Sequence, residues 1–200
     1  MKKLITIAVT LLCVLSCKDN PVVKKAKEVK QAATNSNKLI NEAAKMQDDI
    51  KDLTETTPLT NDELKAWLPN DVHGMKRTAF KTGAMGMMNI ASVEASYATE
   101  DKEKTVKIEV IDGAGEMGAY ATASLRLIFS QDFEEESEDK LRKTVTKNGT
   151  KAIEEYNKRR NKSVIQLFQD KRFYIKATGE GMEIDELWKL VDDMNIKDLG

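Results

Sequence analysis

Cysteine is nearly absent from this chain, because its 200 residues contain only Cys13 and Cys17. Both lie near the N-terminus, and Cys13 falls within a segment that we predict is removed. The remainder then has no disulfide, thiol nucleophile or cysteine-ligated metal site. Histidine is equally rare, since His73 is the single one. A cluster of histidine metal ligands is therefore excluded.

The chain also lacks a charge imbalance. It holds 32 Lys and Arg against 33 Asp and Glu, and removal of residues 1–16 leaves 30 against 33, a net charge of -3. Nucleic-acid-binding domains carry a basic surface, so we expect no nucleic-acid partner. Long apolar runs are missing as well. The longest, residues 4–15, has twelve residues, whereas a membrane-spanning helix needs about 20.

This short apolar run has the features of a secretory signal. Lys2 and Lys3 precede it as a positively charged n-region, and Val14-Leu15-Ser16-Cys17 follows it. The last four residues resemble a bacterial lipobox, in which the cysteine is acylated and becomes the mature N-terminus. The resemblance implies that residues 1–16 are a signal peptide and that lipid on Cys17 anchors the protein to a membrane. The alternative is ordinary secretion with an incidental cysteine.

The residues after Cys17 bear on the location of the protein. Lys18-Asp19-Asn20 resembles the lysine-plus-acid signal of surface-exported lipoproteins in Bacteroidetes-type bacteria. We therefore expect a lipid-anchored protein of the cell envelope, in the outer membrane. The periplasmic and the surface face both stay open.

Residues 17–58 are predicted to form a lipid-anchored helical tether or stalk. Within them, residues 21–53 lack Gly and have Pro only at the first position. Apolar residues recur there at three- and four-residue steps, which is typical of one helical face. They are Val22, Ala26, Val29, Ala33, Leu39, Ala43, Met46, Ile50 and Leu53. The stripe favours a stalk that contacts a protein partner or a second copy, or a linker whose residues 39–53 pack on the domain.

Residues 59–200 are predicted to form an α+β globular domain, an antiparallel sheet with helices packed on it. Alternating apolar residues are typical of half-buried strands, and Asn148-Gly149 is typical of a hairpin turn. Strands are expected at 77–82, 91–97, 106–110, 141–146, 150–156, 163–168 and 172–177. Helices are expected at 60–68, at 116–129 and from a cap at Asp185 onward. The second helix is expected to bury Met117, Ala121, Leu125 and Ile128.

Gly113, Gly115 and Gly118 are spaced as G-x-G-x-x-G, between a strand-like and a helix-like segment. A dinucleotide fingerprint needs a buried parallel strand after the helix. Here an acidic run, residues 131–139, follows instead, and a polar hairpin comes next. We therefore expect a strand-to-helix hinge without a nucleotide. Free N–H groups at the helix start leave a weaker expectation that these glycines bind a small anionic ligand.

Two further patterns contain residue types that can bind metals. Met85, Met87 and Met88, with His73 and Met75 upstream, have the soft donors that Cu(I) prefers. Methionine also fills irregular core gaps, and this is the reading we favour. The acids within residues 132–139 lack the fixed spacing of a calcium loop, so a solvated loop is expected. We expect no metal site, no cofactor and no catalytic constellation.

The domain also shows a resemblance in pattern. Leu68-Pro69…Gly74, the strand end at residues 110–115 and Lys171-Arg172-Phe173…Gly179 resemble features of a group of uncharacterised bacterial envelope proteins. The order of elements is similar to PsbP-like and LpqN-like domains, which are α/β sandwiches known as binding or assembly modules. The resemblance implies a non-enzymatic binding lipoprotein and transfers no site residue. The alternative is an envelope hydrolase or transferase that uses Glu94, Glu109 and Asp112.

Overall fold

A computed structural model describes residues 41, 44–83 and 89–199. The signal peptide, Cys17 and the first part of the tether lie outside the described residues. Over residues 44–199 the order of elements is a helix at 44–55, α2 (Asn61–Trp67), β1 (Asp71–Val72), β2 (Met75–Thr82), β3 (Ser92–Ala98), β4 (Thr105–Asp112), α3 (Gly115–Phe129), β5 (Glu134–Glu136), β6 (Lys140–Lys147), β7 (Thr150–Asn157), β8 (Lys162–Gln169), β9 (Phe173–Glu180), α4 (Ile184–Asp193) and a 3-10 turn, Ile196–Asp198.

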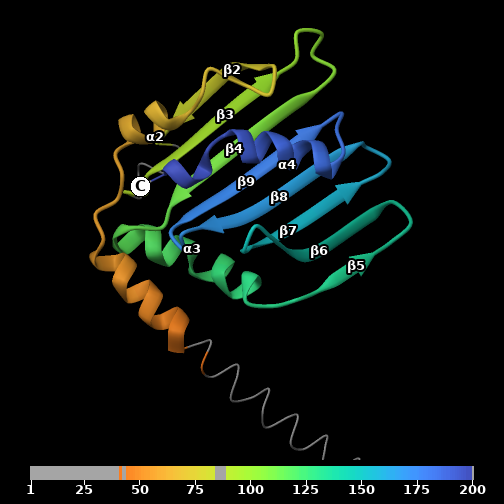
Figure 1. The fold of residues 1–200 in the computed structure, drawn as a ribbon. Coiled ribbons are helices and arrows are strands. Elements are labelled where there is room, and N and C mark those ends of the chain that lie inside the picture. The colour runs from red at the N-terminus through yellow and green to blue at the C-terminus, as the bar shows by residue number, and fades with distance from the viewer. Residues whose placement is uncertain (1–40, 42–43, 84–88, 200) are drawn as a thin grey trace, which may run out of the picture. The chain divides into compact units, whose positions relative to one another are not determined.

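The described strands form one antiparallel sheet in the order β1-β2-β3-β4-β9-β8-β7-β6-β5 (Figure 1). It consists of two meanders, β1 to β4 and β5 to β9, connected along the chain by α3. The meanders join where β4 pairs with β9, in a register from Thr105 opposite Glu180 to Asp112 opposite Phe173. The predicted α+β class with an antiparallel sheet is confirmed.

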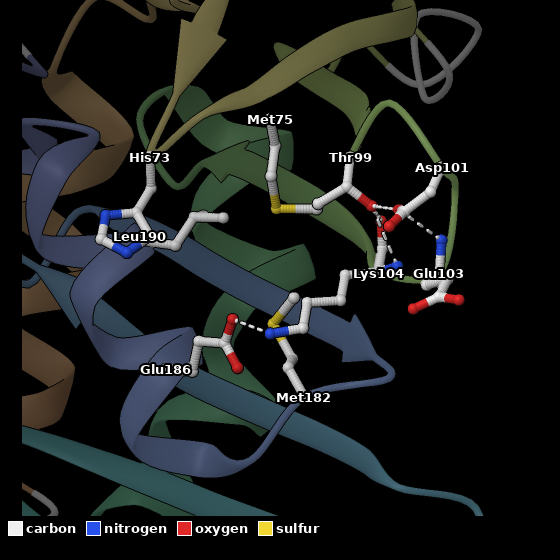
Figure 2. Close-up of a pocket in the computed structure, with 9 residues that line it drawn as sticks. All are labelled: His73, Met75, Thr99, Asp101, Glu103, Lys104, Met182, Glu186 and Leu190. Carbon is white, nitrogen blue, oxygen red and sulfur yellow. Dashed lines mark hydrogen bonds and ion pairs between the residues drawn. The ribbon is translucent and has the colours of Figure 1, made fainter.

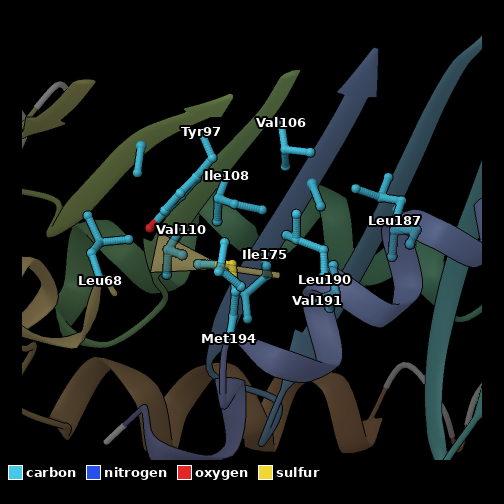
Figure 3. Close-up of a cluster of buried hydrophobic side chains, with 14 of the residues drawn as sticks. Leu68, Tyr97, Val106, Ile108, Val110, Ile175, Leu187, Leu190, Val191 and Met194 are labelled. Atoms are coloured by element: carbon cyan, nitrogen blue, oxygen red, sulfur yellow. The ribbon is translucent and has the colours of Figure 1, made fainter. Parts of the chain in front are cut away.

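One face of the sheet packs against α4 and contains the main core. Strand β4 alternates between half-buried and buried residues, as its sequence predicts, and directs Val106, Ile108 and Val110 into this core. Figure 3 shows them beside Ile175 of β9 and the apolar face of α4. Fully burying one such side chain contributes about 1.5–3 kcal/mol. This apolar face therefore fixes α4 on the sheet.

The sequence predicts the N-terminal cap of α2 correctly, but not that of α4. In α2 the Thr60 hydroxyl accepts from the Glu63 N–H, while the Glu63 carboxylate accepts from the Thr60 N–H at 2.7 Å. The predicted capping box is present. The predicted cap of α4 at Asp185 is wrong. The N-cap is Glu183 and the helix begins at Ile184, so Asp185 lies in the first turn. Its negative charge still interacts favourably with the positive end of the helix dipole.

The opposite face of the sheet packs against α3 at one end only. An aromatic cluster fills this contact, with the Phe129 ring of α3 5.3 Å from the Phe168 ring and 6.5 Å from the Tyr174 ring between centroids. Ile153 of β7 is buried in the same cluster. The rest of this face carries charged and polar side chains, which an antiparallel sheet can present to water.

The segment before α2 contacts the sheet domain through several groups. Leu53 is buried, Lys171 Nζ lies 3.0 Å from the Asp49 carboxylate, and the Gly115 N–H donates to the Thr56 carbonyl at 3.0 Å. Residues 44–200 accordingly form one compact unit. None of the helices in the described ranges is long and apolar enough to cross a membrane.

Candidate functional site

The turn from β4 into α3 is organised by Asp112, whose side chain is fully buried. Arg172 donates from Nε and Nη2 to the two carboxylate oxygens, at 2.8 Å each. The N–H groups of Leu59 and Ala114 donate to the same carboxylate at 2.8 and 2.9 Å. The hydrogen bond to Asp112 is also the main cause that raises the pKa of Arg172. Asp112 is thus a structural anion, and these four donors occupy its carboxylate.

The glycines of this turn are needed for space and for backbone shape. A Cβ on Gly118 would lie 2.6 Å from the Asp112 carbonyl oxygen, so only glycine lets α3 approach the end of β4 this closely. Gly115 has φ of +74°, a conformation that side chains disfavour. Gly115 and Gly118 therefore form the expected hinge between β4 and α3.

The N–H groups at the start of α3 already have partners inside the chain. Gly113 donates to the Arg172 carbonyl at 3.1 Å, Gly115 donates to the Thr56 carbonyl, and Ala114 donates to Asp112 as described. A ligand at Gly113, Gly115 and Gly118 stays a prediction. Such a ligand has to use donors beyond these three.

The predicted inward face of α3 is partly wrong. The buried residues are Gly118, Ala119, Thr122, Arg126 and Phe129, whereas the sequence predicted Met117, Ala121, Leu125 and Ile128. Of the predicted set, Met117 and Ile128 are exposed and the other two are half-buried. The close approach at Gly118 places a small-residue face on the sheet. The most apolar face is thereby left to solvent.

Four large apolar side chains on α3 are exposed as a result. Met117, Tyr120, Leu127 and Ile128 have exposed fractions between 42 and 61%. Their spacing of three, seven and one residues places them on one side of the helix. We call these four residues the α3 surface. Large exposed apolar residues that gather on one side of a helix mark interaction sites more often than scattered ones do.

Arg126 is the charged residue that α3 buries. Its Nη1 donates to the Lys171 carbonyl, and its guanidinium lies 4.5 Å from the centre of the Phe168 ring. Burial lowers the pKa of Arg126, and the Asp49 charge opposes this. These contacts tie α3 to the β8–β9 turn. Arg126 thus has a structural role, which explains why this polar side of the helix faces inward.

Two of the three carboxylates considered for catalysis lie together. Glu94 of β3 stands directly opposite Glu109 of β4. Lys107 Nζ lies 2.8 Å from Glu94 and 3.4 Å from Glu109, and Lys176 Nζ lies 3.4 Å from Glu109. The hydrogen bond to Glu94 is the main cause that raises the pKa of Lys107. Asp112 is not part of this group, because Arg172 holds it.

These two glutamates border a pocket of about 200 Å³ on the α3 side of the sheet. Ser92, Ile111, Tyr174 and Lys176 line it as well. Burial, followed by the charge of Glu109, raises the pKa of Tyr174 to about 12. Its hydroxyl donates to the Gln166 side chain at 2.8 Å. The pocket therefore joins an apolar end near α3 to a charged end on the open sheet.

The raised pKa of Tyr174 predicts an alkaline loss of stability. Its neutral form is favoured in the folded protein, so its contribution is complete below about pH 10 and is lost as the pH rises towards 12. The loss attributable to Tyr174 is about 2 kcal/mol. Urea unfolding between pH 9 and pH 12 measures it. Tyr174→Phe is expected to decline less steeply over this range, and an equal slope in both proteins would contradict the prediction.

A second pocket, of about 180 Å³, lies between the β1–β2 turn, the β3–β4 turn and α4 (Figure 2). Lys104 pairs there with Glu186 at 2.6 Å, and His73 Nδ1 lies 2.9 Å from the Asp193 carboxylate. Met75 is buried in the core beside it. His73 and Met75 from the copper hypothesis therefore share this pocket.

The three remaining methionines of the copper hypothesis cannot be placed in this pocket or outside it. Met85, Met87 and Met88 lie outside the described residues. Within the parts of the chain that the structure covers, no group of three His, Cys, Asp or Glu residues has a metal-binding arrangement.

The acidic run after α3 is not entirely a loop. Glu134–Glu136 form the edge strand β5, paired with β6 so that Glu134 lies opposite Lys143 and Glu135 opposite Arg142. Opposite charges across two strands stabilise such pairing. All three glutamates remain exposed. The strand was missed because three acids in a row show no apolar alternation.

Several residues of these sites could not be found from the sequence. Arg172 is 60 positions from Asp112, and only the β4–β9 pairing brings them together. Ser92 and Tyr174 line the pocket because β3 and β9 flank β4. Neither residue belongs to a motif, so no linear signal identifies it.

Known proteins show few similarities to this chain. No protein-family model matches it, and none of the curated proteins matches it. Among solved structures, a GTP-binding regulator from Thermotoga maritima is similar at 14% identity, over 66% of this chain and 84% of that one, with a TM-score of 0.31. A likeness this weak supports no statement about function.

Proposed function

We propose that this protein is a cell-envelope lipoprotein, anchored through lipid on Cys17, whose α+β domain is a binding module without catalytic activity. The lipobox-like Val14-Leu15-Ser16-Cys17 supports the anchor. The α3 surface carries the binding part of the proposal. Residues 21–53 remain a second proposed contact for a protein partner or for self-association.

The α3 surface has the composition of a protein-binding site. Leu127 and Ile128 are aliphatic, Met117 is a flexible apolar residue, and Tyr120 combines an apolar ring with a hydroxyl. Aromatic residues and Met are enriched at the centres of protein interfaces. An apolar surface on a protein partner therefore fits this region best.

Photocrosslinking in living cells tests this function. A photoreactive phenylalanine at position 120 is expected to form one discrete protein adduct. The control is the same probe at Phe80, an exposed aromatic residue on β2, which is 44% exposed where Tyr120 is 61% exposed. Adding Leu127→Glu to the position-120 variant is expected to reduce the adduct at least about tenfold, because the substitution would bury an unpaired charge in the interface.

Two results would contradict the binding module. One is a position-120 variant, stably expressed, that gives no more adduct than the Phe80 control. The other is an adduct that survives Leu127→Glu unchanged. Leu127 is exposed, so this substitution leaves the fold intact and its effect reports on the surface.

The second candidate, a carboxylate-based hydrolase or transferase, has one observation in its favour. Glu94 and Glu109 lie side by side at a pocket, which is where an acid–base pair would be placed. Each of them, however, is ion-paired with a lysine. Such pairing is also what cross-strand charges on an open sheet produce. We therefore place this function second.

A further inference from the structure

A third pocket, of about 470 Å³, is lined by β6, β7 and β8 together with α4 and the 3-10 turn that follows it. Such a volume is ordinary for a small-molecule site. Leu167 of β8, Trp188 of α4 and Ile196 of the 3-10 turn supply its apolar lining. The Trp188 indole N–H donates to the Glu154 carboxylate at 2.6 Å. This contact fixes the indole ring at the side of the pocket.

Three polar side chains of the lining form one row across the strands. Lys147 stands opposite Thr150 in the β6–β7 pairing. Thr150 and Gln169 lie two residues beyond the last pair of the β7–β8 register and continue it. Opposite residues of antiparallel strands have Cβ atoms about 4.5–5.5 Å apart. The ammonium, the hydroxyl and the amide of this row therefore lie close together in the pocket.

Lys147 differs from the other cations of β6 and β7 in having no acidic partner among the described residues. Its Nζ lies 4.5 Å from the centre of the Trp188 ring, which is its one described contact of this kind. Each of the other cations on these two strands is ion-paired, namely Lys140, Arg142, Lys143 and Lys151. The positive charge of Lys147 is thus available to a bound anion.

Gln169 is a polar residue at an inward-facing position of β8, where it is only 8% exposed. Its side-chain amide has no hydrogen-bond partner among the described residues. Within those residues, the fully covered side-chain polar atoms without a partner are Ser92 Oγ and Arg126 Nε. The Gln169 amide is not one of them, so it is open to the pocket that it lines. A ligand can therefore reach it.

The depth of the lining groups favours a negatively charged ligand. Lys147 is half-buried and Gln169 is buried, whereas the acids of the lining, Asp192 and Asp198, are exposed. Lys197 is an exposed cation of the same lining. The inner end of the pocket thus offers an ammonium, a hydroxyl and an amide N–H. A carboxylate can accept hydrogen bonds from all three.

We propose that this pocket binds a small carboxylate with an apolar body. The carboxylate accepts hydrogen bonds from the Lys147 ammonium, the Thr150 hydroxyl and the Gln169 amide. The apolar body lies on Leu167 and Ile196. The site uses neither the lipid anchor nor the α3 surface, so its test is independent of the proposed function.

Titration of the purified protein with matched compounds tests the proposal, with the indole N–H signals of Trp67 and Trp188 followed by NMR. Trp188 lines the pocket and Trp67 does not. 3-Phenylpropionate is therefore expected to shift the Trp188 signal saturably and to leave the Trp67 signal in place. 3-Phenylpropionamide lacks the charge and is expected to bind at least about tenfold more weakly. Acetate lacks the apolar body and is also expected to bind at least about tenfold more weakly.

The cationic analogue 3-phenylpropylamine is expected not to bind. Two results overturn the proposal. One is a Trp188 signal that does not move at about 10 mM 3-phenylpropionate. The other is binding of the amine as strong as that of the carboxylate.

Variants then assign the binding to the polar row. Lys147→Gln is expected to weaken 3-phenylpropionate binding at least about tenfold, and Gln169→Leu about tenfold. Leucine at 169 continues the apolar inward pattern of β8, so the fold is retained. The control is Lys151→Gln, because Lys151 is paired with Asp132 and does not line the pocket. It is expected to bind as the unmodified protein does. Unchanged binding in either pocket variant, or equal weakening by the control, overturns the assignment.

Discussion

Replacement of Asp112 by alanine is expected to lower the free energy of unfolding by about 3–5 kcal/mol. The reason is the burial of the pair that Asp112 forms with Arg172. Removing the carboxylate leaves the guanidinium, most of whose surface is covered, without its counter-charge. It also leaves the Leu59 and Ala114 N–H groups without their acceptor. Because a domain is stable by only about 5–15 kcal/mol, this single change is large.

Urea unfolding followed by circular dichroism measures the effect. Asp139→Ala is the matched control, because its partner Arg159 has a side chain that is 76% exposed and such pairs contribute about 1 kcal/mol or less. A double-mutant cycle with Arg172→Ala then isolates the coupling between the two residues. A loss below about 1 kcal/mol for Asp112→Ala would show that the buried pair does not hold the β4–α3 turn.

Replacement of Cys17 by serine is expected to abolish lipid labelling completely. A serine hydroxyl cannot take the place of the thiol that a lipobox cysteine offers for acylation. Without acyl chains, each buried methylene of which contributes about 0.8 kcal/mol, the protein is expected to leave the membrane fraction. Labelling of cells with a radioactive or alkyne-bearing fatty acid, followed by fractionation, measures both effects.

The chain offers its own control for the anchor. Cys13 is the only other cysteine and lies in the apolar part of the predicted signal peptide. Cys13→Ser is therefore expected to retain full labelling. Labelling that persists in Cys17→Ser, or that disappears in Cys13→Ser alone, is incompatible with lipid on Cys17.

The main elements of the domain are predictable because their signals are local. Strand β4 alternates with period two, the Asn148-Gly149 turn adopts positive φ at both residues, and α2 carries a complete capping box. Each pattern reflects the geometry of a few consecutive residues, so no distant contact is needed to interpret it. The α+β class and the antiparallel sheet follow from these signals.

The orientation of α3 is not predictable from a pattern of apolar residues. Hydrophobicity alone directs Met117 and Ile128 inward, yet both are exposed. Gly118 can approach the end of β4 as no other residue can, and Arg126 finds a carbonyl and an aromatic ring beneath the helix. These contacts outweigh the apolar stripe. The proposed partner surface exists because of this difference.

The sequence alone predicts most of the strands and helices and the hinge at the glycines, since each depends on neighbouring residues, and the lipid anchor stays a prediction from the lipobox-like motif. Tertiary structure decides which residues meet. The pairing of β4 with β9 brings Asp112 to Arg172, and the order β3-β4-β9 places Ser92, Glu94 and Tyr174 around one pocket. The physical reason is that strand partners are chosen by the free energy of the whole sheet and its core, which no local segment contains.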